Sequence, residues 1–326
     1  MLAPFLIDIE KELLPVSLLE ILLTDRTTGN NIFWATSDYE HLGEGFSFGD
    51  TITLKQVTGE NRDVVIPRVL KSKEEKKTRT QNMAEIFTPT WVCNEQCNAF
   101  DESLTGVTNL FNTPTFVDNK HDWIPRAGKI PLPEEVTWQE YISQNCLEIT
   151  CGEAPYLVSR YDTTTGESIP IYKRIGLLDR KLRIINENTT TFNEWYSSVI
   201  LAYKCTYGYE WQGDNILLAR ENLLSTFIDY YRDRWEKLPL EDQTAEVATI
   251  VSWNIFQMDG LKMVLPMTCH DRVLVKREIF EDKEIVLPCE GCNDNKIHRH
   301  NGIYAVIMDW KAGEPIEFRS LYPETL

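Results

Sequence analysis

Short apolar segments alternate with segments of helical periodicity along this chain, and this alternation limits the folds that are open to it. Segments typical of strands occur at 147–150, 205–210, 249–256 and 304–308. The clearest helical segment is 215–231, where apolar residues recur on one face. Because strands that alternate with helices form a mostly parallel sheet, the sequence predicts an α/β fold with helices on both faces of the sheet.

The length of 326 residues suits one large core with smaller additions. Hydrophobic residues make up 42% of the chain, which is enough to bury a sizeable core. We predict a small N-terminal α+β subdomain at 1–66 and a larger domain at 67–326. Insertions at 101–145 and 155–205 interrupt the larger domain, and a Cys/His-rich segment lies at 269–300.

Several shorter elements follow from the same periodicities. The sequence predicts helices at 5–24, 91–100 and 194–204, and short strands at 32–36 and 51–54.

The formal net charge of −17 argues against a surface that binds nucleic acid indiscriminately, because contacts to phosphate need Lys and Arg. Two local features leave room for such contacts. The charged run at 68–79 is either a solvated linker or helix face, or a segment that contacts phosphate. A basic cluster at 173–183 has the same two interpretations.

Charged residues interrupt the apolar start of the chain at positions 8, 10, 11, 12 and 20, so this start resembles neither a signal peptide nor a membrane span. The eight cysteines are expected to be reduced thiols. We therefore expect a cytoplasmic protein with no membrane partner.

Acidic residues stand where the predicted strands end. Glu148 precedes the turn that contains Cys151 and Gly152, Glu210 ends the next strand, and Asp259 follows the third. In doubly wound sheets ligands bind at the carboxyl ends of the strands, and a glycine turn lets the backbone approach them. Glu210 is suited to accept both hydroxyls of a ribose, or is a solvent-facing acid. Asp259 could bind the exocyclic amine of a purine.

Phe87, Thr88 and Pro89 precede a predicted helix. Thr88 stands before a proline and is therefore extended, while Pro89 suits the first turn of a helix. Backbone amides at such a helix start can bind a carboxylate, although the segment is also explained as a helix start alone.

A separate constellation of metal-ligand residues lies near the end of the chain. Its members are Cys269, Cys289, Cys292, His298 and His300. A C-x2-C pair with histidines fits a structural zinc site, and a reduced cysteine pair with surface histidines is the alternative.

Taken in order, the helix start, the glycine turn and the two later acids resemble the gamma-type N6-adenine DNA methyltransferases, which are modification subunits of restriction systems. The resemblance covers residues 80–312 and implies a Rossmann-like sheet that binds S-adenosylmethionine. It implies DNA as a partner, with a restriction or specificity subunit as a second.

The resemblance also implies roles for single residues in the cofactor site. Phe87, Thr88 and Pro89 would contact the methionine part of the cofactor. Glu148, Cys151 and Gly152 would form the turn beneath it. Glu210, with Trp211 beside it, would hold the ribose, and Asp259 would lie near the adenine. Glu153 and Ala154 stand where the family has Ser and Gly.

The catalytic motif of that family, N/D-P-P-Y/F/W, has no full counterpart in this chain. Its best positional match is Asp309 and Trp310, which lack both prolines. The resemblance implies that Asp309 accepts hydrogen bonds from the target amine and that Trp310 stacks on a flipped adenine.

Two functions follow as hypotheses. The first is an S-adenosylmethionine-dependent DNA adenine-N6 methyltransferase of a restriction-modification or anti-phage system. The second is a catalytically inactive subunit of the same fold that binds cofactor or DNA within a defence complex. Methylation of a protein or RNA is a weaker third hypothesis.

Overall fold

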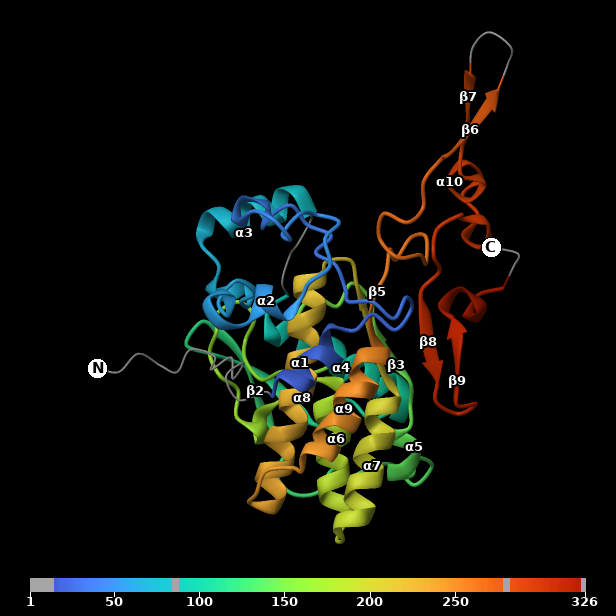
Figure 1. Cartoon of the computed structure of the whole chain (residues 1–326). Helices are drawn as coiled ribbons and strands as arrows, with labels where there is room; N and C mark the ends of the chain where they lie inside the picture. Colours follow the sequence, from blue (N-terminus) through green and yellow to red (C-terminus); the bar gives the residue numbers. More distant parts are fainter. Residues whose placement is uncertain (1–14, 84–87, 278–281, 324–326) are drawn as a thin grey trace.

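The computed structural model describes residues 15–83, 88–277 and 282–323. Within them, three parallel strands form a small sheet in the order β3-β4-β5. Two helices connect β3 to β4, and two more connect β4 to β5 (Figure 1). The strands and their connections are β3 (Cys146–Glu148), α6 (Leu177–Asn188), α7 (Phe192–Lys204), β4 (Thr206–Glu210), α8 (Gly213–Trp235), α9 (Glu241–Asn254) and β5 (Ile255–Gln257).

Antiparallel two-stranded ribbons and shorter helices surround this unit. The ribbons are β1 (Asn112–Val117) with β2 (Lys120–Pro125), β6 (Arg272–Arg277) with β7 (Asp282–Leu287), and β8 (Val306–Asp309) with β9 (Glu314–Glu317). The other α-helices are α1 (Val16–Leu23), α2 (Leu54–Val57), α3 (Lys73–Met83), α4 (Thr90–Thr105), α5 (Trp138–Ile142) and α10 (Glu290–Asp294). Short 3-10 turns lie at Glu40–Leu42, Gly59–Asn61, Arg68–Leu70, Ile171–Lys173, Ile297–Arg299 and Phe318–Leu321.

One large hydrophobic core joins the N-terminal segment to the parallel unit. It includes Leu22, Trp34, Trp195 and Phe227, all of which are fully buried. Helix α1 packs against α9 and α8. A second, smaller core holds Phe256 together with residues that flank β8 and β9. The β8–β9 ribbon is therefore attached to the end of the parallel unit through this second core.

The mixed α/β class predicted from the sequence is confirmed, whereas the sheet is smaller than predicted. Helices α4, α7 and α8 contain the predicted helices 91–100, 194–204 and 215–231. The described part of the predicted helix 5–24 is α1, and residues 1–14 lie outside the described residues.

Four predicted strands take other forms. The prediction of a strand at 249–256 is wrong, because α9 runs to Asn254 and only the last two residues enter β5. Val247 and Val251 are four residues apart on one buried face of α9, so burial on a helix explains the apolar run. Segment 304–308 contributes to the antiparallel β8 and not to the parallel sheet. Segments 32–36 and 51–54 are joined by an isolated bridge between Phe33 and Thr51.

Among the described helices, none combines the length and the apolar composition needed to cross a bilayer.

Candidate functional site

The carboxyl ends of the three parallel strands meet around Glu210. Its register partner on β5 is Gln257. The chain leaving β3 returns to this point, where the Cys151 amide donates to the Tyr209 carbonyl at 2.9 Å. The Gly152 amide donates to Glu210 Oε2 at 2.9 Å. The Met258 amide, just after β5, donates to the Glu210 carbonyl at 3.0 Å. Glu210, Gly152 and the segment before Asp259 therefore lie together at the carboxyl ends of the parallel strands, as predicted. We refer to this end as the acidic edge of the sheet.

The turn after β3 uses left-handed backbone at three alternate positions. These are Thr150, Gly152 and Ala154, with φ of 46°, 54° and 63°. Ala154 stands where the resembled family has glycine, and an L-residue adopts this conformation at a cost of about 1–2 kcal/mol. The turn therefore has left-handed backbone at Ala154 as well as at Gly152.

The carboxylate of Glu210 is held by backbone amides. Besides the Gly152 amide, it accepts the Trp211 amide at 2.9 Å and the Gln212 amide at 3.3 Å. Burial raises the pKa of Glu210, although these three hydrogen bonds act in the opposite direction. The side chain is therefore fixed at the end of β4 with its oxygens towards the turn after β3.

Glu148 plays a similar part at the end of β3. Its carboxylate accepts the Tyr156 amide at 3.3 Å and the Leu157 amide at 3.2 Å. Burial raises the pKa of Glu148 well above its ordinary value, and the charge of Glu210 adds to the shift. Two buried acids thus share this edge of the sheet.

Glu153, the unusual acid of the turn, is engaged by protein groups. Its carboxylate accepts the Arg68 amide at 2.6 Å and the Tyr161 hydroxyl at 2.5 Å. The Glu153 carboxylate, which would repel the carboxylate of a cofactor, therefore accepts hydrogen bonds from the protein's own donors.

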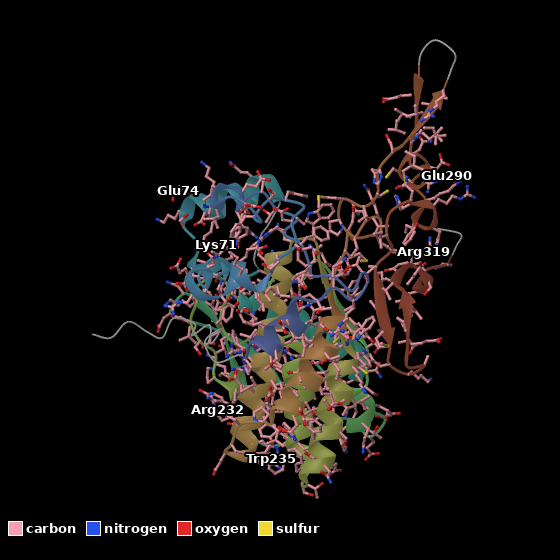
Figure 2. The ribbon with its side chains drawn as sticks, viewed as in Figure 1. Lys71, Glu74, Arg232, Trp235, Glu290 and Arg319 are labelled. Carbon is pink, nitrogen blue, oxygen red and sulfur yellow. The ribbon has the colours of Figure 1, made fainter. Side chains whose placement is uncertain are left out.

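Cations of the charged run at 68–79 are buried beside the same edge. Lys71 and Arg79 form ion pairs with Asp214, in the first turn of α8, at 3.0 and 2.9 Å. Although burial alone would raise it, the charges of Arg79 and Lys71 hold the pKa of Asp214 well below its usual range. Figure 2 shows Lys71 near the region of α3, far from Trp235 at the other end of α8. Lys71 and Arg79 are therefore neither part of a solvated linker or helix face nor in contact with phosphate, because they are buried against Asp214.

Asp259 and Trp211 also have partners within the chain. Asp259 Oδ1 accepts the Leu261 and Lys262 amides at 2.9 and 3.2 Å, and so holds the turn after β5. The Trp211 indole donates to the Ala35 carbonyl at 3.1 Å. Trp211 therefore fastens the loop after β4 to the N-terminal segment.

The helix start at Thr88 and Pro89 already binds a carboxylate. Pro89 is the N-cap of α4, and the Thr90 amide donates to Asp162 Oδ2 at 3.3 Å. The Thr88 carbonyl accepts the Thr163 hydroxyl at 3.1 Å. Phe87 lies outside the described residues. The predicted anion-binding property of this helix start is thus used by the chain itself.

Asp309 and Trp310 lie near the amino ends of the parallel strands, opposite the carboxyl ends where Glu210 lies. The Trp310 indole donates to Asn254 Oδ1 at 2.8 Å. Asn254 in turn donates to the carbonyl of Thr206, the first residue of β4, at 3.0 Å. Glu210 ends the same strand, and five residues of strand span about 13 Å. The structure does not bring the residues predicted for catalysis together with those predicted for the cofactor.

The carboxylate of Asp309 has a structural role. Its Oδ1 accepts the Lys311 and Ala312 amides at 2.9 and 3.0 Å, which holds the turn between β8 and β9.

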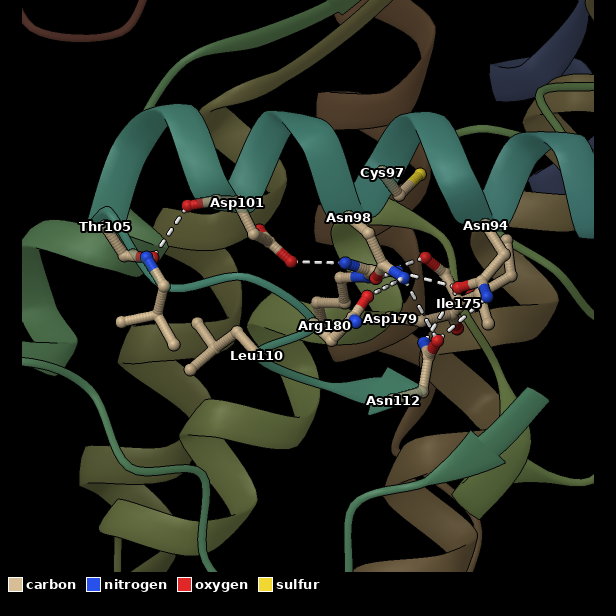
Figure 3. A network of polar contacts seen from close by, with 12 residues as sticks. Asn94, Cys97, Asn98, Asp101, Thr105, Leu110, Asn112, Ile175, Asp179 and Arg180 are labelled. Carbon is tan, nitrogen blue, oxygen red and sulfur yellow. Dashed lines mark hydrogen bonds and ion pairs between the residues drawn. The ribbon is translucent and has the colours of Figure 1, made fainter. Parts of the chain in front are cut away.

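The basic cluster at 173–183 is also paired inside the protein. Arg180 is buried, forms an ion pair with Asp101, and donates to Asn94 and Asn98 at 3.0 and 2.9 Å (Figure 3). Arg174 pairs with Asp229 at 2.6 Å. These contacts join α4 to α6, and the 3-10 turn before α6 to α8, so the two arginines stabilise the fold and are not free to contact phosphate.

Four of the five predicted metal ligands converge. The ligand atoms of Cys269, Cys289, Cys292 and His300 all lie within 4.8 Å of one another, so this Cys3His cluster could hold a metal ion. Cys289 is the N-cap of α10, and Cys292 lies one turn later. Although burial opposes it, hydrogen bonds from the amides of Cys292 and Asn301 lower the pKa of Cys289 to about 6.

His298 is not part of this cluster, and the prediction that it ligates metal with His300 is wrong. The two residues belong to a 3-10 turn and its C-cap, where they do not share a face as they would on a strand. Gly291 also shapes this cluster, which its place in the C-x2-C pair did not predict. A Cβ atom there would lie 2.5 Å from the His300 amide nitrogen, so only glycine lets the C-x2-C turn approach His300.

Together these features define a mixed α/β protein with a small parallel sheet, an acid-lined edge and a separate Cys3His cluster. Comparison with protein-family models, curated proteins and solved structures gave no match for the chain.

Proposed function

We propose that this chain is a methyltransferase-fold subunit that binds S-adenosylmethionine at the edge formed by Glu148, Gly152, Glu210 and Asp259, and that it does not transfer the methyl group by itself. The observation that carries the proposal is the hydrogen bond from the Gly152 amide to the Glu210 carboxylate. It places a glycine turn after one parallel strand beside an acid at the end of the next, and Rossmann-like sheets bind ribose with an acid in such a position.

The donors and acceptors at this edge fit an adenosine-type cofactor. An ionised carboxylate has about four acceptor positions, and backbone amides occupy three of those on Glu210. A ribose hydroxyl takes the fourth directly, and the second hydroxyl binds by replacing the longest of the three amide bonds. Asp259 lies two residues after β5, at a place suited to the adenine amine.

The geometry at Asp309 favours the non-catalytic form of this function. A methyl group bound near Glu210 would lie at the opposite end of β4 from Asp309 and Trp310. In addition, the Asp309 carboxylate and the Trp310 indole are both engaged in holding the chain. Transfer needs the acceptor within about 3–3.5 Å of the methyl carbon, which these positions do not support.

The proposed setting is a cytoplasmic restriction-modification or anti-phage complex. A partner, either a specificity subunit or a restriction subunit, would supply the contacts to DNA. The internal pairing of Lys71, Arg79, Arg174 and Arg180 supports this division of labour, because these cations are committed to carboxylates of the same chain.

We also propose that the Cys3His cluster binds one zinc ion. Three thiolates and one imidazole are the ligand set that zinc favours over hard cations such as magnesium. None of the eight cysteines, all of which lie within the described residues, forms a disulfide, which suits a reducing compartment.

The test of the proposed function is calorimetry with S-adenosylmethionine, followed by methyl transfer to adenine-containing DNA. We expect binding to the wild-type chain, no transfer by the chain alone, and a loss of about 1–3 kcal/mol of binding free energy in Glu210→Gln. Glu241→Gln, an exposed acid at the start of α9, is the matched control and should bind normally.

Absence of binding would reject the cofactor site. Methyl transfer that is lost in Asp309→Ala would instead establish the catalytic hypothesis.

A further inference from the structure

The β6–β7 ribbon has little to hold it in place except its own pairing. Figure 1 shows it projecting from the rest of the molecule beyond α10. Most of its described apolar side chains are exposed, including Val273 at 54%, Leu274 at 52% and Val286 at 58%. An isolated two-stranded ribbon is marginally stable in water. Something other than a hydrophobic core must therefore keep its strands paired.

Two ligands of the Cys3His cluster flank the ribbon, one before β6 and one after β7. Cys269 precedes the first residue of β6 by three positions, and Cys289 follows the last residue of β7 by two. The two sulfur atoms lie 3.3 Å apart. The Cys289 amide also donates to Asp271 Oδ1 at 3.0 Å. An ion bound by Cys269 and Cys289 would close the base of the ribbon.

The spacings from His300 to the three sulfurs match a tetrahedral site, while the 3.3 Å between the sulfurs of Cys269 and Cys289 is shorter than a tetrahedral edge. Zn–S bonds of about 2.3 Å and a Zn–N bond of about 2.0 Å give edges of about 3.8 Å between sulfurs and about 3.5 Å from sulfur to nitrogen. Cys269 Sγ lies 3.6 Å from Cys292 Sγ. The Nδ1 atom of His300 lies 3.4, 3.7 and 3.6 Å from the sulfurs of Cys269, Cys289 and Cys292. The edges to His300 agree with one small ion at the centre.

The cluster is separate from the main core. None of its four ligands belongs to the hydrophobic cluster that joins α1, α8 and α9. On the other side, the His300 amide donates to the Tyr304 hydroxyl at 2.8 Å, and Tyr304 belongs to the smaller core beside β8. Loss of the ion should therefore release the ribbon and leave the helical body folded.

We infer that the zinc ion is a clamp on which the folding of the β6–β7 ribbon depends, so that the projecting ribbon is present only in the metal-bound protein. This inference rests on the proposed binding of zinc. Cys269 and Cys289 close the base of the ribbon, while Cys292 and His300 fasten that base to α10 and to the segment before β8.

The experiment is amide hydrogen exchange on the full chain before and after zinc removal by a chelator, with metal content measured in parallel. We expect one zinc per chain. After removal, exchange of the ribbon amides at 273–275 and 285–287 should accelerate by about tenfold or more, while α8 and α9 change little. Adding zinc back should restore protection, and adding magnesium should not.

Two histidine variants form a matched pair. His300→Ala should lose zinc and ribbon protection, whereas His298→Ala, two residues away and outside the cluster, should keep both. A protein that binds no zinc would reject the zinc proposal itself. Stoichiometric zinc whose removal leaves ribbon exchange unchanged, or opens α8 and α9 as well, would reject the clamp while the zinc site stands.

Discussion

The acids at the carboxyl ends of the parallel strands show which features of the site could be predicted from the sequence and which could not. That Glu148 and Glu210 lie at one edge followed from their positions at the ends of successive parallel strands. Their environments did not follow, because the amides that bind them come from residues after the turns. The choice of His300 over His298 depends in the same way on a 3-10 turn that the H-x-H spacing does not reveal.

Glu148 should make stability depend on pH. Burial raises its pKa well above the ordinary value of 4.5, so the folded state binds the proton more tightly than the unfolded state. The resulting stabilisation is present in full below pH 4.5 and is lost as pH rises through the folded-state pKa, by up to about 1.4 kcal/mol per pH unit. Urea unfolding of Glu148→Gln at a series of pH values should show a smaller loss over this range.

The exposed Glu241→Gln should keep the wild-type pH dependence. An unchanged slope in Glu148→Gln would mean that Glu148 ionises normally in the folded protein.

At the scale of elements, periodicity identified long helices and failed where a helix met a strand. The interior of α8 was predictable because its apolar residues recur over several turns. The run 249–256 was not, since β-branched residues such as Ile250 and Val251 suit a strand and a buried helix face equally. The antiparallel pairing of β8 with β9, which takes Asp309 away from the parallel sheet, depends on contacts that only the folded chain makes.

The end of α8 offers a test of helix capping. Glu236 is the C-cap, is exposed, and has left-handed backbone with φ of 54°. Glycine adopts this conformation without a Cβ clash, so Glu236→Gly should raise the free energy of unfolding by about 0.5–1 kcal/mol. Glu241→Gly places glycine in the first turn of α9, where the backbone is right-handed, and should instead destabilise the protein. Thermal unfolding of both variants distinguishes the two effects, and destabilisation by Glu236→Gly would contradict this view of the cap.

For the whole molecule, the N-terminal segment is joined to the parallel unit by buried contacts. The Gly213 amide donates to the Trp34 carbonyl at 3.0 Å, and Arg220 donates to the Thr24 carbonyl at 2.9 Å. Gln257, at the end of β5, donates to the Phe33 carbonyl at 2.8 Å. A boundary near residue 66 could be proposed from the sequence, but these hydrogen bonds between distant segments could not be predicted from it.

A chain that begins at residue 67 should therefore fail to unfold cooperatively. It would expose the part of the core around Leu22 and Trp34, and would leave the Gly213 amide and Nη1 of the buried Arg220 without their partners. Thermal melts followed by near-ultraviolet circular dichroism should show no sharp transition. In the full chain, Leu22→Ala should cost about 2–5 kcal/mol, whereas Val16→Ala, at a position 57% exposed on the same helix, should cost little. A cooperative melt of the shortened chain would show instead that residues 1–66 are an independent subdomain.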